Sequence, residues 1–169
     1  MDEKHYEQSY EQYVRWIRKN PAVLPYLILL NRLLTIIGYL VYPAILLYLA
    51  LLHDDRLLTY LLIPAICFIL VSVFRKIYNK SRPYEQPGVD TLTIRNKKGQ
   101  SFPSRHVFCY SLISILLCSI WLPAGILMLL SCLFLAWTRV ILGVHYPIDV
   151  LAGAILGILS AIITIAVSL

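Results

Sequence analysis

Three ionisable residues stand close together near the C-terminal end of the chain. Arg139, His145 and Asp149 lie between two long apolar runs, where charged side chains are costly and usually serve a function. His145 and Asp149 are four residues apart and share a face if both lie on one helix. If Pro147 instead opens a new helix, His145 lies just outside it. In both arrangements the carboxylate can reach one imidazole nitrogen and leave the other free for chemistry. The alternative is an interfacial patch in which Arg139 snorkels and His145 caps a helix.

A second, strongly basic stretch follows an apolar run and extends from residue 75 to residue 84. Arg75 and Arg82 are seven residues apart, which is two helical turns, so both can point the same way. Pro83 is expected to end that helix. The alternative is the positive flank that any membrane helix can have.

A third stretch combines a helix start with two potential phosphate ligands. Ser104 follows Pro103 and is a suitable N-cap, and a helix N-terminus with free N–H groups binds anions. Arg105 and His106 add a fixed cation and a titratable donor there. Taken alone, His106 is better explained as an interfacial aromatic residue.

The elements that must position these residues are membrane helices. The chain has 169 residues, of which 59% are hydrophobic and 14% are charged, whereas a soluble domain has about a quarter charged residues. A helix needs about 20 apolar residues to cross a bilayer. We therefore predict a single domain over residues 1–169, an all-α integral membrane bundle of five spans. They are placed at residues 27–52, 57–74, 105–122, 124–144 and 147–169.

The first 25 residues are polar and lack an apolar centre, so a secretory signal peptide is not expected. Residues 5–19 carry Tyr6, Tyr10 and Tyr13 at helical spacing, which favours an interfacial helix with aromatic rings at headgroup level. A solvated tail is the alternative. The net charge is +6, and the basic residues flank the spans. We therefore expect the bilayer and an anionic lipid as partners, and no nucleic acid.

The last span contains a pair of small residues four apart, Gly153 and Gly157. Such a pair lets helices approach closely. We interpret it as packing within the bundle, with a homodimer contact as the secondary alternative.

Following the predicted spans across the bilayer brings the three polar stretches to one face. Four arginines, two histidines, one aspartate and a helix N-terminus then converge. Fixed cations around a helix start indicate a phosphate ligand, and two histidines can act as nucleophile and proton donor. No second carboxylate cluster lies on that face, so neither a metal site nor another cofactor is expected.

These stretches resemble the motifs of the type 2 phosphatidic acid phosphatase superfamily, which also includes vanadium haloperoxidases. That family carries K-x6-RP, PSGH and SR-x5-H-x3-D. The corresponding residues here are Arg75-x6-Arg82-Pro83, Pro103-Ser104-Arg105-His106 and Thr138-Arg139-x5-His145-x3-Asp149. The resemblance covers residues 75–149. The chain departs from the pattern in having Arg75 for Lys, Arg105 for Gly and Thr138 for Ser, and in having five expected spans where many members have six.

The resemblance implies a role for each matched residue. His145 attacks phosphorus and becomes a phosphohistidine, Asp149 holds its other nitrogen, and His106 protonates the leaving oxygen. The phosphate oxygens are held by Arg75, Arg82, Ser104, Arg105 and Arg139. Fixed guanidinium groups can supply positioning and charge stabilisation without a metal.

The resemblance therefore implies a metal-independent phosphatase for a membrane lipid phosphate. We favour an isoprenoid diphosphate such as undecaprenyl diphosphate, because Arg105 could contact a second phosphate. Phosphatidic acid and phosphatidylglycerol phosphate are alternative substrates, and a lipid phosphotransferase is an alternative activity. A non-enzymatic carrier of lipid phosphates would keep the arginines but would not need His106, His145 and Asp149 together.

Charge bias and family habit predict opposite orientations in the cell membrane. Five spans place the N-terminus and the motifs on one face. Apart from the motif arginines, that face holds Lys4, Arg15, Arg18, Lys19, Arg32, Lys76, Lys80, Arg95, Lys97 and Lys98. The other face has Arg56 alone. Basic short loops stay cytoplasmic, whereas many relatives that act on lipid diphosphates work on the outer face. We favour a cytoplasm-facing site.

Overall fold

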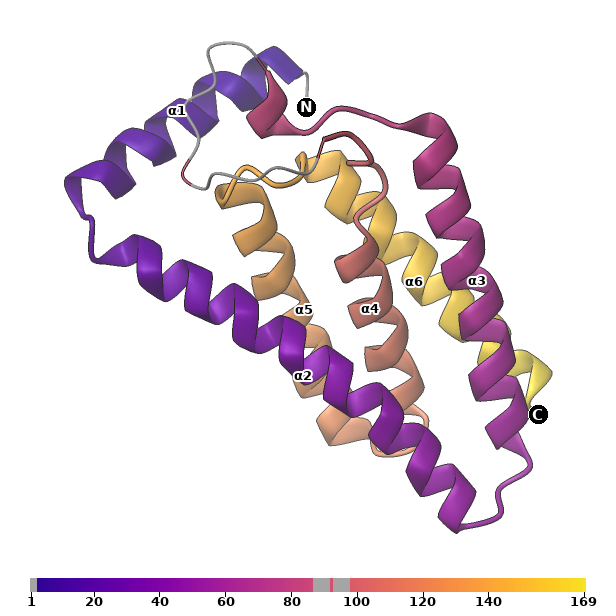
Figure 1. Ribbon diagram of the computed structural model, residues 1–169. Coiled ribbons are helices and arrows are strands. Elements are labelled where there is room, and N and C mark those ends of the chain that lie inside the picture. Colours follow the sequence, from indigo (N-terminus) through magenta and orange to yellow (C-terminus); the bar gives the residue numbers. More distant parts are fainter. Residues whose placement is uncertain (1–2, 87–91, 93–97) are drawn as a thin grey trace.

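The computed structural model describes residues 3–86, residue 92 and residues 98–169, with residues 3–9 described by their backbone alone. The described part contains six α-helices, one 3-10 helix and no strand. In chain order they are α1 (Glu3–Lys19), α2 (Val23–Leu51), α3 (Arg56–Tyr78), η1 (Pro83–Glu85), α4 (Arg105–Cys118), α5 (Leu122–Ile141) and α6 (Pro147–Val167). The predicted all-α helical bundle is confirmed (Figure 1).

Four of these helices, α2, α3, α5 and α6, are long and apolar enough to cross a membrane, judged by length and composition. Their outward faces expose large apolar side chains such as Leu47, Leu62, Leu127 and Leu151, as expected of surfaces that face lipid. The third predicted span, residues 105–122, is shorter than expected, because α4 ends at Cys118. At 1.5 Å per residue α4 is about 21 Å long, less than the roughly 30 Å hydrocarbon core.

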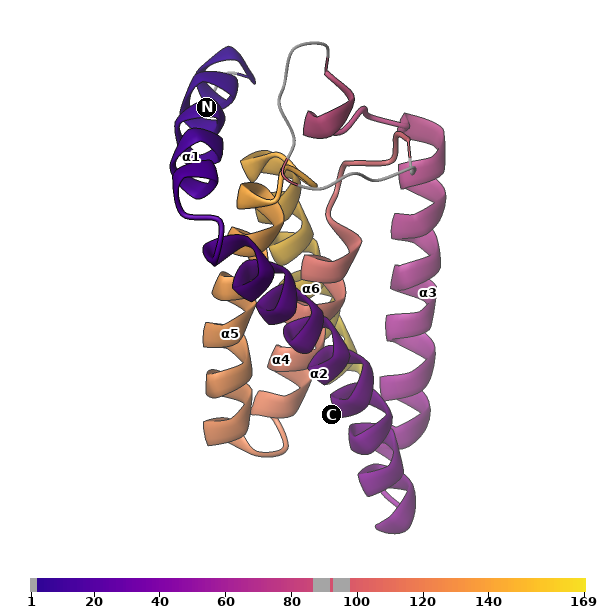
Figure 2. The ribbon, with the colours of Figure 1, turned by 60° about the vertical axis from the view of Figure 1, so that its left-hand side comes forward.

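The short helix α4 is the centre of the bundle. It contacts α2, α3, α5 and α6, and the two views show it enclosed by them (Figures 1 and 2). A helix that is apolar all round belongs in an interior. The buried residues of α4 are Val107, Phe108, Tyr110, Ser111, Leu112, Ile113, Ser114 and Leu116. The first residues of α4 are therefore held among the ends of its neighbours.

The two glycines of α6 bring that helix close to α4. A Cβ atom on Gly153 would meet the carbonyl group of Ser104, and one on Gly157 would meet the Phe108 carbonyl and the Ser111 side chain. Larger residues would push the helices apart. The predicted packing within the bundle is what the structure shows, and a homodimer contact through these glycines stays an untested alternative.

The N-terminal helix α1 packs on the connection between α5 and α6, residues 142–146. Three buried side chains of α1 make this contact: Tyr10, Val14 and Ile17. Tyr13 and Trp16 are exposed, which fits an interfacial helix. The expectation that Tyr10 reaches the headgroups is wrong, because Tyr10 is turned inward. The side chain of Tyr6 lies outside the described residues, as do Arg95 and Lys97.

The turn between α2 and α3 lies at the end of the molecule opposite α1 (Figure 1). There the carboxylate of Asp54 pairs with the guanidinium of Arg56 at 2.7 Å. Hydrogen bonds from Arg56 lower the pKa of Asp54 to about 2. The turn is polar.

Candidate active site

His145 lies in the connection between α5 and α6, because α6 begins at Pro147. The second of the two predicted arrangements is therefore the correct one. Gly143 has φ +66, a conformation that L side chains rarely adopt, and it reverses the chain after α5. The amides of Val144 and His145 then both donate to the carbonyl of Arg139, at 3.1 and 3.2 Å. This backbone arrangement fixes His145 beside the end of α5.

The imidazole of His145 faces the carboxylate of Asp149. Nδ1 of His145 is 3.6 Å from Oδ2 of Asp149 and 3.4 Å from the hydroxyl of Ser101. Ser101 donates a hydrogen bond to the same oxygen, and so does the amide of Tyr146, at 3.0 Å. His145 is 2% exposed and Asp149 is fully buried. Nδ1 is thus engaged, and Nε2 is the nitrogen left for a substrate.

Burial lowers the pKa of His145 to about 4, although its hydrogen bond with Asp149 acts in the opposite direction. A buried imidazole resists protonation because the low-dielectric surroundings disfavour its charged form. His145 is therefore neutral at pH 7, as a nucleophile must be.

Lys80 completes the surroundings of this carboxylate, a contact that the sequence does not reveal. Its ammonium is 3.5 Å from Oδ1 of Asp149 and 4.5 Å from the centre of the Tyr146 ring. Its carbonyl accepts a 2.8 Å hydrogen bond from the amide of Ser101. Lys80 and Ser101 thus approach the carboxylate together.

Arg75 and Arg82 both reach the loop that precedes α4, but they do not share a helix face. Helix α3 ends at Tyr78, and Asn79 follows in the left-handed conformation with φ 42. The expectation that Pro83 ends the helix is therefore wrong, because the chain turns four residues earlier. Arg82 reaches the loop from outside the helix.

The hydrogen bonds found for Arg75 all go to main-chain carbonyl groups. It donates to Gln100, Ser101 and Pro103. Nε of Arg82 donates to the carbonyl of Gly99 at 2.9 Å. Both arginines are buried. They fix the loop from Gly99 to Pro103 beside His145 and Asp149, and this loop carries Ser101.

Ser104 occupies the N-cap position of α4, as predicted, but its side chain makes no capping hydrogen bond. Its Oγ is buried and has no hydrogen-bond partner among the described residues. Buried hydroxyl groups in native proteins usually have a hydrogen-bond partner. The amide of Ser104 donates to the carbonyl of Asp149 at 2.8 Å. This bond holds Ser104 close to Asp149.

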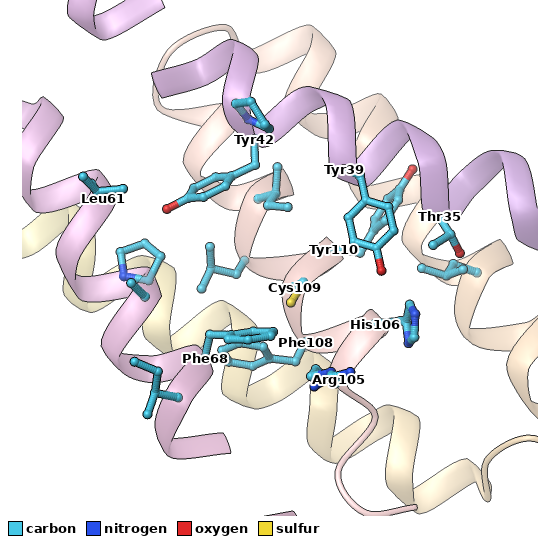
Figure 3. Close-up of a pocket in the computed structure, with 18 residues that line it drawn as sticks. Thr35, Tyr39, Tyr42, Leu61, Phe68, Arg105, His106, Phe108, Cys109 and Tyr110 are labelled. Atoms are coloured by element: carbon cyan, nitrogen blue, oxygen red, sulfur yellow. The ribbon is translucent and has the colours of Figure 1, made fainter. Parts of the chain in front are cut away.

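Arg105 and His106 begin α4 and line an apolar cavity of ≈ 620 Å³ between α2, α3, α4 and α5. Figure 3 shows both side chains at one end of this cavity, with the hydroxyl of Tyr39 directed toward His106. The guanidinium of Arg105 lies 5.4 Å from the centre of the Phe68 ring. The rest of the lining is mostly apolar, and it includes Pro43 and Pro64. This cavity suits a hydrocarbon chain with an anionic end.

Two residues of α2 hold the end of α5, and sequence reasoning missed both. The guanidinium of Arg139 donates to Thr35 Oγ1 at 3.1 Å, and Thr138 Oγ1 lies 3.4 Å from Asn31 Oδ1. Asn31 is buried. An amide inside a predicted membrane span was the available signal, because polar groups there usually have a function or a partner.

The structure thus joins the three predicted stretches. The loop before α4, the connection before α6 and the segment after α3 meet around Asp149, while Arg105 and His106 face the cavity. Among the described residues no group of three or more His, Cys, Asp or Glu side chains could hold a metal ion. The roles assigned to the individual site residues remain predictions.

Comparison with known proteins identifies related chains. The family model described as "PAP2 superfamily" matches residues 56–169. The chain is 34% identical over 102 residues to "Bacitracin transport permease protein BcrC" of Bacillus licheniformis, covering 57% of this chain and 50% of that protein. It is 30% identical over 86 residues to "Putative undecaprenyl-diphosphatase YbjG" of Escherichia coli (strain K12), covering 47% of this chain and 42% of that protein. The chain thus spans about half the length of the curated relatives it matches.

Two solved structures share the fold. The crystal structure of Aquifex aeolicus LpxE superposes with a TM-score of 0.69 at 24% identity, covering 86% of this chain and 87% of that one. A transmembrane PAP2-type phosphatidylglycerolphosphate phosphatase from Bacillus subtilis superposes with a TM-score of 0.56 at 20% identity, covering 96% of this chain and 94% of that one. At these identities the likeness concerns the fold alone. It extends over α2, which precedes the residues that the family model matches.

Proposed function

The chain belongs to the PAP2 superfamily, and from this membership we propose that it is a metal-independent membrane phosphatase for a lipid phosphate. One observation carries the proposal: the apolar cavity ends at Arg105 and His106, on the helix whose N-cap is tied to Asp149. A hydrocarbon chain in the cavity would place its phosphate near His145 and Asp149. A phosphate carrier would need the cations but not a buried histidine–aspartate pair.

The reaction we propose has two steps at His145. In the first, Nε2 attacks phosphorus, the bond from phosphorus to the leaving oxygen breaks, and His106 protonates that oxygen. In the second, water attacks the phosphohistidine, gives up its proton to His106, and releases inorganic phosphate and neutral His145. Asp149 orients the imidazole through Nδ1 and stabilises its positive charge.

Fixed cations hold the phosphate oxygens in this proposal. Phosphoryl transfer depends mainly on positioning and on stabilising charge. Arg82 and Arg139 supply guanidinium groups, and Ser104 supplies the buried hydroxyl that has no partner among the described residues. Arg75 adds positive charge, but its hydrogen bonds to the loop carbonyls support a role in holding the loop in place.

The substrate we favour is an isoprenoid diphosphate. The name of the Escherichia coli relative, a putative undecaprenyl-diphosphatase, supports this class, and Arg105 at the cavity end offers a cation for a second phosphate. Phosphatidic acid and phosphatidylglycerol phosphate are the alternatives. Transfer to another lipid in place of water would use the same first step.

We also propose that the protein lies in the cell membrane with its site facing the cytoplasm. The four long apolar helices support a multi-pass membrane protein. The basic residues at the end that carries α1 and the site support the cytoplasmic side.

The decisive experiment measures phosphate release by the purified protein in detergent from undecaprenyl diphosphate, phosphatidic acid and phosphatidylglycerol phosphate. Release should occur in the presence of EDTA and should be inhibited by vanadate, a phosphate analogue. The His145→Ala variant serves as the blank. Activity that disappears with EDTA and returns with magnesium would disprove the metal-independent mechanism.

A further inference from the structure

Lys80 lies beside Asp149, yet the two-step mechanism assigns it no part. Its ammonium is 3.5 Å from Oδ1 of Asp149, and the Lys80 side chain is only 19% exposed. We propose that Lys80 is a positioning residue that holds the Asp149 carboxylate in the orientation that His145 requires. The inference rests on the proposed phosphatase function and adds a residue to its machinery.

The two oxygens of the Asp149 carboxylate have different surroundings. Oδ2 accepts hydrogen bonds from the Ser101 hydroxyl and the Tyr146 amide, and it faces Nδ1 of His145. Oδ1 has no hydrogen-bond partner among the described residues and faces Lys80. A fully buried carboxylate is costly unless both of its oxygens are compensated. The ammonium of Lys80 supplies this compensation at Oδ1.

The backbone of Lys80 makes this contact more than a chance approach of a long side chain. The chain leaves α3 through Asn79 in the left-handed conformation, and the next carbonyl, that of Lys80, accepts the Ser101 amide at 2.8 Å. Lys80 therefore holds Ser101 through its main chain and Asp149 through its side chain. Both contacts end on the carboxylate that faces His145.

Neighbouring basic residues do not duplicate this contact. Arg75, at the end of α3, donates to carbonyl groups of the loop before α4. Lys76 is exposed. The ion pairs found for Asp149 in the described part of the chain are those with Lys80 and His145.

Removing the ammonium should change how the pair responds to acid. A cation beside Asp149 favours the carboxylate and disfavours a second cation on His145. Without the ammonium, the charged form of Asp149 should be less favoured and the pKa of His145 should rise. His145 should then lose its neutral, nucleophilic form at a higher pH. Among the described residues, the charged or titratable groups that act on His145 are Arg82 after α3, His106 on α4, Arg139 on α5 and Asp149 on α6, and Lys80 acts through Asp149. All except Lys80 stay in place in the variant.

The test compares Lys80→Met, which keeps the apolar stem, with Lys80→Arg and with the exposed control Lys76→Met. Phosphate release from undecaprenyl diphosphate is measured in detergent across the acidic and neutral range. In Lys80→Met, kcat should fall roughly tenfold to a hundredfold, as a misplaced catalytic group does. The acid limb of kcat should move up by about one pH unit, with KM little changed. Lys80→Arg should recover most of the rate, and Lys76→Met should match the wild type.

Three results would overturn the proposal: an unchanged rate and pH profile in Lys80→Met, a change in KM alone, or an equal loss in Lys76→Met. A change in KM alone would make Lys80 a phosphate ligand. Circular dichroism and size-exclusion elution in detergent check that the variants fold. If Lys80→Met does not fold, Lys80→Gln takes its place.

A second measurement is independent of turnover. The titration of His145 is followed by NMR of ring-labelled histidine and assigned by its loss in His145→Gln. It should move to higher pH in Lys80→Met, and an unmoved titration rejects the inference. A wild-type protein that releases no phosphate from any lipid would instead reject the proposed function.

Discussion

The amide of Ser104 donates a 2.8 Å hydrogen bond to the main-chain carbonyl of Asp149. This bond joins the N-cap of α4 to the first turn of α6, and Gly153 keeps the two helices close enough for it to form. The hydroxyl of Ser104 and the carboxylate of Asp149 are therefore held in a fixed relation. A phosphate bound at the helix start would meet His145 at a set position, which is what phosphoryl transfer requires.

The first prediction concerns the nucleophile and its partner. His145→Ala should reduce phosphate release below detection, because the attacking nitrogen is gone. Asp149→Asn should reduce kcat by roughly a hundredfold to ten-thousandfold, since it loses orientation and charge stabilisation but keeps the nucleophile. Both rates are measured on detergent-purified protein with matched helical content. Full activity in His145→Ala would disprove the proposed chemistry.

A second prediction follows from the pKa of His145. Burial lowers that pKa to about 4, so the imidazole is neutral and nucleophilic above this pH and becomes protonated as the pH falls through it. The acid limb of kcat/KM should therefore lie near pH 4, below the value of about 6.5 for a free histidine. A pH–rate profile in a constant-ionic-strength buffer provides the measurement. An acid limb at the free value would mean that His145 is more solvated than the structure shows.

The third prediction tests Arg105 as a determinant of substrate choice. Arg105→Gly should lower kcat/KM for undecaprenyl diphosphate by roughly tenfold to a hundredfold, the value of a hydrogen bond to a charged group. The same change should have little effect on phosphatidic acid, which has one phosphate. Equal effects on the two substrates would indicate that Arg105 anchors α4, through contacts such as that with Phe68.

The fourth prediction concerns Thr35, which lines the cavity and accepts a hydrogen bond from Arg139. Thr35→Val keeps the volume but removes the acceptor, so KM should rise by about tenfold. Thr35→Ser retains the hydroxyl and should behave like the wild type. The KM of each variant is measured by steady-state kinetics on one lipid phosphate. Equal KM values in the two variants would show that the position of Arg139 does not depend on the hydroxyl of Thr35.

The sequence predicted the helices and the meeting of the three motifs for clear physical reasons. Long uncharged runs must cross the bilayer, and alternating spans then bring residues 75–82, 103–106 and 139–149 to one face. The shortness of α4 was not predicted, because its apolar residues continue past Cys118. A helix enclosed by four others leaves no polar face to mark its ends.

Contacts made by irregular backbone could not be predicted either. The roles of Lys80 and Ser101 depend on the left-handed Asn79 and on the path of the loop that follows. Periodicity does not describe such segments. Lys80 therefore counted as one more basic residue beside a membrane span. The contact of Thr35 with Arg139 joins residues 104 positions apart, and no local pattern indicates it.

The last prediction concerns the side of the membrane on which the site lies. Helix α1 packs on the connection that carries His145, so the basic N-terminal helix and the site share one face. Lys80 pairs with Asp149, so it no longer counts among the basic residues that indicate the orientation. Arg15, Arg18 and Lys19 on α1 still do. Short segments rich in Lys and Arg stay in the cytoplasm. We therefore expect a cysteine on this face to be protected in intact cells.

The measurement uses a membrane-impermeant maleimide on an active variant without native cysteines. A single cysteine replaces Gln86, beside the site, or the exposed Lys98 on the same face. Asp55→Cys, in the exposed turn between α2 and α3, is the control for the opposite face. Asp55→Cys should react in intact cells, whereas the two site-face cysteines should react only after permeabilisation, because the bilayer keeps the reagent from the cytoplasm. The reverse pattern would place the site outside and would leave the proposed chemistry unchanged.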